Sequence, residues 1–175
     1  MKYLHSLSNK LVLTLLGLLL ILSAGFISFA IWSTPLFLQE LNQKLNLDLA
    51  NNIVKEKKLI VNNKINQKAL KSVFMGLMVV NPIIEVYLTD KNGKLLSYSA
   101  PKGVVKLDNI NLAPVKEFIN EEQPLPLLGN DPRNPGIQKV FSAAPIYQGK
   151  NLQGYLYIVL GGQEYDSVVE LLESS

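Results

Sequence analysis

The chain has 175 residues, of which 48% are hydrophobic and 18% are charged. A soluble domain usually carries about 25% charged residues, so this composition favours one domain attached to a membrane. Lys2 and Lys10 supply two of the 17 basic residues, which leaves 15 basic and 14 acidic groups in residues 33–175. That balance, with Arg133 as the only arginine, argues against a nucleic-acid-binding surface.

Cysteine and histidine exclude several kinds of chemistry. The chain has no cysteine, which excludes disulfides, cysteine-ligated zinc and thiol nucleophiles. The only histidine, His5, precedes a long apolar segment, so neither a Ser-His-Asp triad nor a histidine metal cluster can form beyond it. We interpret His5 as a polar residue that flanks a membrane segment.

The apolar segment from Leu11 to Trp32 reads LVLTLLGLLLILSAGFISFAIW and contains 22 uncharged residues. As a helix it would be roughly 33 Å long, enough to cross a bilayer core of about 30 Å. Lys2 and Lys10 precede it, whereas only Lys44 follows within about 20 residues. The positive-inside rule therefore predicts a cytoplasmic N-terminus and a periplasmic location, beyond the bacterial inner membrane, for residues 33–175.

A cleavable signal peptide is the alternative for the same segment. Its charged region would be Lys2 to Lys10, its apolar region Leu11 to Leu22, and its cleavage site Ser28-Phe29-Ala30. The apolar stretch is longer than such a region usually is, which favours the membrane helix. Both interpretations export the rest of the chain.

Two helices are predicted after the membrane segment. Thr34 is placed as an N-cap with Pro35 at the first helical position, and this helix is expected to run to about Val54. Its apolar face consists of Leu38, Leu41, Leu45 and Leu49. After a turn at Asn62-Asn63, a second helix should end at Asn81-Pro82; its apolar residues are Leu70, Val73, Phe74, Leu77 and Met78.

From residue 84 the apolar period changes to two, which predicts strands. Residues 84–89 and 95–99 form one predicted hairpin around Asp90-Lys91-Asn92-Gly93, and residues 138–147 and 152–160 form a second. In the last strand, Leu152, Gly154, Leu156, Ile158 and Leu160 are expected to face one way, and Gln153, Tyr155, Tyr157 and Val159 the other. Short helices are predicted over residues 112–120 and 163–173, with the loop PLPLLGNDPRNPG after the first.

The order of these elements predicts an α+β fold: a transmembrane helix, a long membrane-proximal helix, and a PAS-like antiparallel sheet of four to five strands with flanking helices. The corresponding parts are a cytoplasmic N-terminus (1–10), the transmembrane helix (11–32), membrane-proximal helices (33–80) and the extracytoplasmic sheet (81–175).

Three stretches carry a family resemblance. MVVNPIIEVYLTDKNGKLLSYSAP, QKVFSAAPI and LQGYLYIVLGGQEYDSV resemble the extracytoplasmic PAS-like (Cache, or PDC) region of bacterial two-component sensor histidine kinases. The resemblance implies a homodimeric membrane receptor for a small-molecule ligand. It also implies a following kinase region that uses ATP and Mg and passes phosphate to a response regulator. The chain ends in ELLESS, where the family's second membrane helix would begin, so we expect a longer natural protein.

In the resembling sensors a ligand lies between the sheet and the long loop that covers it. On that basis the candidate ligand-binding residues are Tyr87, Tyr98, Arg133, Lys139, Tyr155 and Tyr157. Arg133 or Lys139 would pair with a carboxylate of the ligand. For each residue, packing within a half-buried sheet is the competing interpretation.

Two further patterns give weaker indications of function. Gly161-Gly162-Gln163-Glu164-Tyr165 is similar to the GG[DE]EF hairpin of diguanylate cyclases, but Gln163 replaces an acidic metal ligand, so a glycine turn is preferred. The loop from Gly129 to Gly136 has one carboxylate, Asp131, too few to predict a calcium site.

Three alternatives to a kinase sensor stay open. The chain could be a stand-alone anchored or secreted binding protein, or the sensor of a chemotaxis receptor or a cyclase. A hydrolase that uses carboxylates is the third, although no pair such as Glu85 and Asp90 has a distinctive setting. No catalytic residue, metal site or cofactor is predicted within this chain, and its signal is not identified by the sequence.

Overall fold

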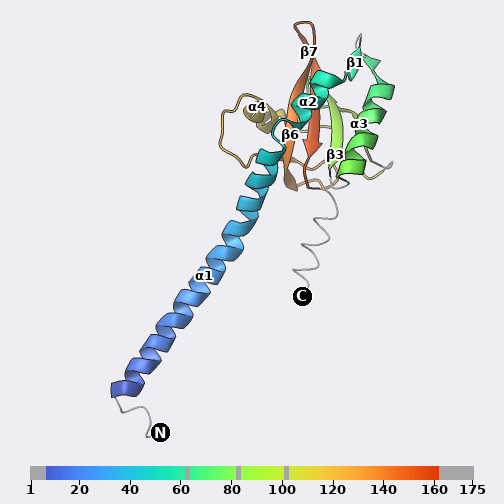
Figure 1. Cartoon of the computed structure of the whole chain (residues 1–175). Helices are drawn as coiled ribbons and strands as arrows, with labels where there is room; N and C mark the ends of the chain where they lie inside the picture. The colour runs from blue at the N-terminus through green and yellow to red at the C-terminus, as the bar shows by residue number, and fades with distance from the viewer. Residues whose placement is uncertain (1–6, 62–63, 82–83, 101–102, 162–175) are drawn as a thin grey trace. The chain divides into compact units, whose positions relative to one another are not determined.

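The computed structural model describes residues 7–61, 64–81, 84–100 and 103–161. Within these ranges the chain contains four helices and seven strands. It is α+β, as Figure 1 shows. It divides into two compact units, Met1–Leu38 and Gln39–Ser175. The predicted α+β class is confirmed at this level.

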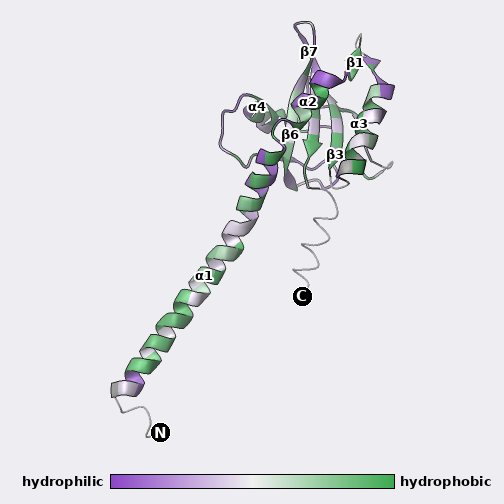
Figure 2. Cartoon of the chain, in the orientation of Figure 1, coloured by the Kyte–Doolittle hydropathy of each residue, from purple (hydrophilic) through white to green (hydrophobic). Residues whose placement is uncertain are grey.

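The first unit consists of helix α1, which spans Leu7–Leu45 and so continues into the second unit. Its large apolar side chains between Leu11 and Trp32 are exposed, from 52% for Leu13 to 74% for Ile21. Figure 2 shows this part of α1 predominantly green, the colour of hydrophobic residues. Among the described residues it is the one helix long and apolar enough to cross a membrane. An exposed apolar surface of this extent is more favourable in contact with lipid than with water.

The predicted helix start at Pro35 is wrong, because α1 continues through this proline. Thr34 does not cap a new helix; its Oγ1 donates a hydrogen bond of 2.7 Å to the carbonyl of Ala30, four residues earlier in α1. Proline lacks an N–H and so removes one backbone hydrogen bond of the helix. A helix tolerates this loss where neighbouring polar groups compensate for it. The helix also ends earlier than expected, at Leu45, and α2 (Leu49–Glu56) follows after a turn.

The predicted second helix is confirmed as α3, Gln67–Val80. Asn66 caps its N-terminus, since its side-chain oxygen accepts a hydrogen bond of 3.2 Å from the amide of Ala69. Before it, β1 (Ile60–Val61) and β2 (Lys64–Ile65) form a small antiparallel pair that the sequence did not indicate. The expected turn at Asn62-Asn63 lies outside the described residues, as does the predicted helix over 163–173.

The main sheet is antiparallel and contains five strands in the order β4-β3-β7-β6-β5. Both predicted hairpins are present, and the short helix α4 (Leu112–Ile119) follows the first. A strand that was not predicted, β5, lies within the proline-rich loop. The strand bounds are β3 Glu85–Asp90, β4 Leu95–Tyr98, β5 Leu128–Asn130, β6 Gln138–Gln148 and β7 Asn151–Val159.

Both faces of the sheet are buried. One face carries Val86, Leu88, Leu156 and Ile158, and it packs with residues of α2, β1, β2 and α3. The opposite face packs with residues of α4 and of the loops on either side of it. The sheet is therefore the middle layer of the second unit, with helices on one side and a loop-rich cover on the other.

The expected alternation along the last strand is confirmed from Tyr155 to Leu160 but is wrong for Leu152. Leu156, Ile158 and Leu160 belong to the helix-covered face, and Tyr155, Tyr157 and Val159 to the opposite face. Leu152 packs with the latter group. The cause is a register shift near Ile146, where Gly154 pairs with Ile146 but Leu152 pairs with Tyr147. One extra residue in a strand reverses the direction of the side chains beyond it.

Candidate functional site

The loop-covered face of the sheet carries most of the polar chemistry of the second unit. We call it the tyrosine face and define it by Glu85, Tyr87, Phe141, Tyr155 and Tyr157. These residues alternate along β3, β6 and β7, so each strand contributes every second side chain to the same surface. The segment 121–137, which leads from α4 to β6, supplies Asp131 and Arg133 against it.

Tyr87 lies at the centre of an aromatic group. It pairs directly with Tyr98 on β4 and with Tyr157 on β7, and its ring centroid is 6.4 Å and 6.3 Å from theirs. Phe141 extends the group, 5.1 Å from Tyr157. Tilted rings at these distances are a favourable arrangement of aromatic pairs. The cluster therefore joins four strands, β4, β3, β7 and β6.

Arg133 and Glu85 form an ion pair across this face. Arg133 Nε lies 3.0 Å from Glu85 Oε1, and the two side chains are only 14% and 5% exposed. The hydroxyl of Tyr87 donates a hydrogen bond of 2.5 Å to Glu85 Oε2. Arg133 Nε has no hydrogen-bond partner among the described residues, because the pair satisfies the distance but not the direction that a hydrogen bond requires.

A second ion pair joins the segment 121–137 to β6. Lys139 Nζ lies 3.0 Å from Asp131 Oδ2, and the aspartate side chain is 1% exposed. Asp131 also accepts hydrogen bonds from the amide of Arg133, at 2.9 Å, and from Asn134 Nδ2, at 3.0 Å. Asp131 thus organises the tight turn that carries Arg133. The two ion pairs together are electrically neutral.

Burial pushes the pKa of both carboxylates upward, but their net pKa shifts have opposite directions. Burial raises the pKa of Glu85 above its ordinary 4.5, although Tyr87 and Arg133 act against this rise. Burial also pushes the pKa of Asp131 upward, but the hydrogen bonds from Asn134 and Arg133, together with Lys139, outweigh it and hold that pKa below 3.8. Burial likewise raises the pKa of Tyr87, helped by the hydrogen bond to Glu85, and the pKa of Tyr157. Glu85 is therefore the carboxylate that takes up a proton more readily.

The six residues predicted from the sequence all lie on or against the tyrosine face. Tyr87, Tyr98 and Tyr157 are brought together, Arg133 contacts Glu85, and Lys139 contacts Asp131. Tyr155 is buried on the same face and pairs with Thr89 and Pro145, so it lies further along β7. Both cations already have internal partners, so a carboxylate ligand would compete for them with Glu85 or Asp131.

Sequence reasoning did not assign Glu85 and Asp131 to this site. Glu85 was considered only as a hydrolase carboxylate, and Asp131 only as a weak calcium ligand. The signal for Glu85 was its two-residue spacing from Tyr87, which puts both on one face of a strand. Within the described part of the chain, no group of three or more histidine, aspartate or glutamate side chains is placed to hold a metal ion.

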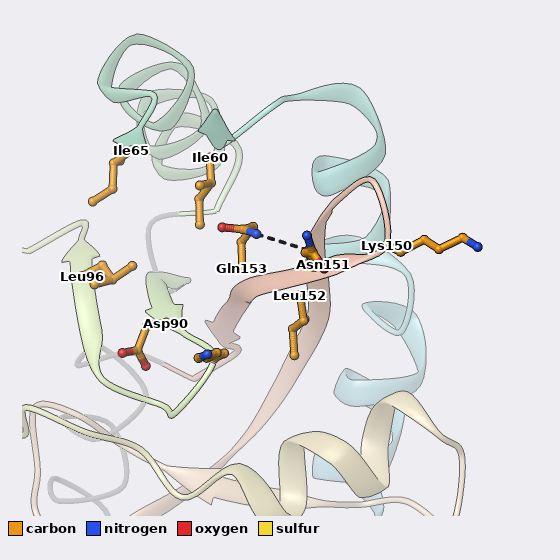
Figure 3. A pocket seen from close by; sticks show the side chains of 9 residues that line it. Ile60, Ile65, Asp90, Leu96, Lys150, Asn151, Leu152 and Gln153 are labelled. Atoms are coloured by element: carbon orange, nitrogen blue, oxygen red, sulfur yellow. Dashed lines mark hydrogen bonds between the residues drawn. The ribbon is translucent and has the colours of Figure 1, made fainter. Parts of the chain in front are cut away.

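A separate hollow of about 580 Å³ opens beside the β1–β2 pair (Figure 3). Ile60, Ile65 and Leu96 surround it, together with residues at the end of β3, in the two hairpin turns and at the start of β7. Gln153 Nε2 donates a hydrogen bond of 3.3 Å to the carbonyl of Asn151 at its edge. None of the six predicted residues lines this hollow.

The chain matches no protein-family model, no curated protein and no solved structure.

Proposed function

We propose that this chain is the membrane-anchored, extracytoplasmic sensor region of a two-component sensor histidine kinase. The observation that carries the proposal is that α1 joins an apolar segment to the sheet without a break. One continuous helix contains the apolar segment from Leu11 to Trp32 and also Asn42 and Gln43, whose side chains bond to the sheet. A membrane anchor that is continuous with a domain's hydrogen-bonded core is suited to transmit a change in that domain.

The architecture of the second unit supports a PAS-like assignment. Its antiparallel sheet has its first and last strands, β3 and β7, as neighbours, with the remaining strands outside them. Helices cover one face, and a long segment with α4 covers the other. This arrangement fits the sheet, flanking helices and covering loop that the resemblance implies.

The tyrosine face is the proposed place of signal reception. A small ligand with a carboxylate could replace Glu85 beside Arg133 or Asp131 beside Lys139. Such a ligand changes the balance of conformations only as far as it binds one of them more tightly. A kinase region, its ATP and Mg, and a response regulator belong to this proposal as implied by the resemblance.

A homodimer is part of the same proposal. Leu38, Leu41 and Leu45 of α1 are 46%, 41% and 77% exposed, and their spacing puts them along one stripe of the helix. The fourth leucine of the predicted row, Leu49, lies in α2 and packs with the core instead. The row therefore divides into a core residue and three exposed residues that a second copy would cover.

The proposal is tested by measuring the mass and the phosphorylation of the native protein in isolated membranes. We expect a species well above 19.5 kDa, the mass of this chain, that takes phosphate from ATP onto a histidine. Arg133→Met should alter the steady phosphorylation level, whereas Lys150→Met, on an exposed turn, should leave it unchanged. A native species of 19.5 kDa, or a larger one that never becomes phosphorylated, would refute the kinase assignment.

A further inference from the structure

The backbone pairing of β5 with β6 ends at Leu128, although the same register could continue for one more residue pair. Leu128 pairs with Val140, Gly129 with Lys139 and Asn130 with Gln138. Continuing that register would place Leu127 opposite Phe141. The carbonyl of Val140 accepts the amide of Leu160, on the β7 side. Because main-chain groups alternate in direction along a strand, those of Phe141 point toward Leu127.

The side chain of Gln43 lies where a Leu127–Phe141 backbone pair would form. We call the hydrogen-bonded link at this position the rung. Gln43 Oε1 accepts a hydrogen bond of 2.7 Å from the amide of Leu127. Its Nε2 donates to the carbonyl of Leu127 at 3.0 Å and to that of Phe141 at 2.8 Å. The side chain is 0% exposed. A primary amide offers a donor and an acceptor as a peptide group does, so Gln43 can substitute for a strand at this point.

We propose that Gln43 is a removable rung of the sheet. In one arrangement its amide is inserted between Leu127 and Phe141, as observed. In the other it is withdrawn, and Leu127 and Phe141 pair directly as the next step of the β5–β6 ladder. Both arrangements satisfy the partly buried amide of Leu127, and an amide shielded from water and left without an acceptor would be costly. The exchange gives the Gln43 side chain of α1 two discrete states, one bonded to Leu127 and Phe141 and one released from them.

The rung also connects α1 to the ion pairs. Leu127 leads directly into β5, whose last residue, Asn130, accepts a hydrogen bond of 2.8 Å from the hydroxyl of Tyr157. Asp131 and Arg133 follow on the same short stretch of chain and are held by Lys139 and Glu85. A shift of Leu127 toward Phe141 therefore acts on a segment whose other end carries the ion pairs. This inference holds whether or not the chain is a kinase sensor.

Amide hydrogen exchange on the full chain in lipid nanodiscs tests the proposal with two substitutions. Gln43→Ala empties the space, so Leu127 and Phe141 can close, and the Leu127 amide should exchange within about threefold of its rate in the unaltered chain. Gln43→Met keeps the space filled without any hydrogen bond. There the Leu127 amide should exchange about 10- to 100-fold faster, as expected for an amide that loses its acceptor. The smaller side chain thus preserves more protection.

Asn42→Ala is the matched control. It removes one hydrogen bond from α1 to the sheet, the 3.0 Å bond to the carbonyl of Leu160, and leaves the rung in place. Exchange at Leu127 should not change in this variant. The proposal is overturned if Leu127 loses protection equally in Gln43→Ala and Gln43→Met. It is also overturned if Gln43→Ala loses protection at Tyr157 and Val159, because the sheet then opens instead of closing the rung.

Discussion

Arg133 and Glu85 are close but poorly aligned: the nitrogen Nε lies 3.0 Å from Oε1, yet it makes no hydrogen bond among the described residues. A buried ion pair stabilises a fold only where good geometry compensates for the loss of hydration. This pair lacks that geometry, while Glu85 has a second partner in Tyr87. The pair is therefore better suited to exchange partners than to hold the fold rigidly.

Replacing Arg133 by methionine should make stability depend on the proton at Glu85. At pH 7 we expect Arg133→Met to lower the free energy of unfolding by about 2–4 kcal/mol, because a buried carboxylate loses its counter-charge. At pH 5 the loss should be smaller, since Glu85 can take up a proton. Urea unfolding followed by circular dichroism measures both values. An equal loss at both pH values would show that Glu85 is not the group affected.

Glu85→Gln should remove one part of the pH dependence of the free energy of unfolding. The folded-state pKa of Glu85 is raised above its ordinary 4.5, so the folded state binds this proton more tightly than the unfolded state does. The resulting stability is fully present below pH 4.5 and is lost as pH rises through the raised pKa. Unfolding measured from pH 4 to pH 8 should show this decline in the unaltered chain and not in Glu85→Gln. Parallel profiles for the two chains would contradict the assignment.

Asp131→Asn should show the opposite dependence. The folded-state pKa of Asp131 is lowered below 3.8, so its contribution is present above that value and is lost as pH falls through the folded pKa. At pH 7 we expect a loss of about 3–5 kcal/mol, because the substitution breaks the buried ion pair between Asp131 and Lys139. The difference from the unaltered chain should narrow in acid. A difference that stays constant down to pH 3 would indicate that the turn geometry, not the charge, matters.

Tyr157→Phe removes only the hydroxyl that bonds to the carbonyl of Asn130 at 2.8 Å. The side chain is fully buried, so we expect a loss of about 1–3 kcal/mol from the unsatisfied carbonyl. Tyr147→Phe is the control, because Tyr147 is 59% exposed and should change stability by less than about 0.5 kcal/mol. Chemical denaturation of both variants makes the comparison. Equal effects would mean that the bond to Asn130 does not tie β5 to β7.

The chain has no cysteine, so single introduced cysteines report the membrane topology directly. With a cytoplasmic N-terminus, Lys150→Cys should react with a membrane-impermeant maleimide added to intact cells, and Ser8→Cys should react only after lysis. Both positions are exposed in the structure. Labelling of Ser8→Cys in intact cells would reverse the predicted orientation, and recovery of Lys150→Cys in the culture medium would favour cleavage of the segment.

The sequence alone determined the elements whose signals are local. The uncharged run from Leu11 to Trp32, the end of α3 before Asn81 and the Asp90–Gly93 turn each depend on residues close together in the chain. The two-residue period also placed Tyr87 and Tyr157 on strands, and the six candidate residues all lie on or against one face. Local signals also misled at Pro35, where the surrounding helix overrode the usual start signal.

Only the tertiary structure decided which charges and amides meet. Gln43 is 84 residues from Leu127 in the sequence, and its amide completes a rung between strands that no period along α1 indicates. Glu85 and Arg133 meet because the loop after α4 folds over β3, and the raised pKa of Glu85 follows from that burial. Periodicity reports which residues share a face, but the partner that covers the face is chosen by long-range packing.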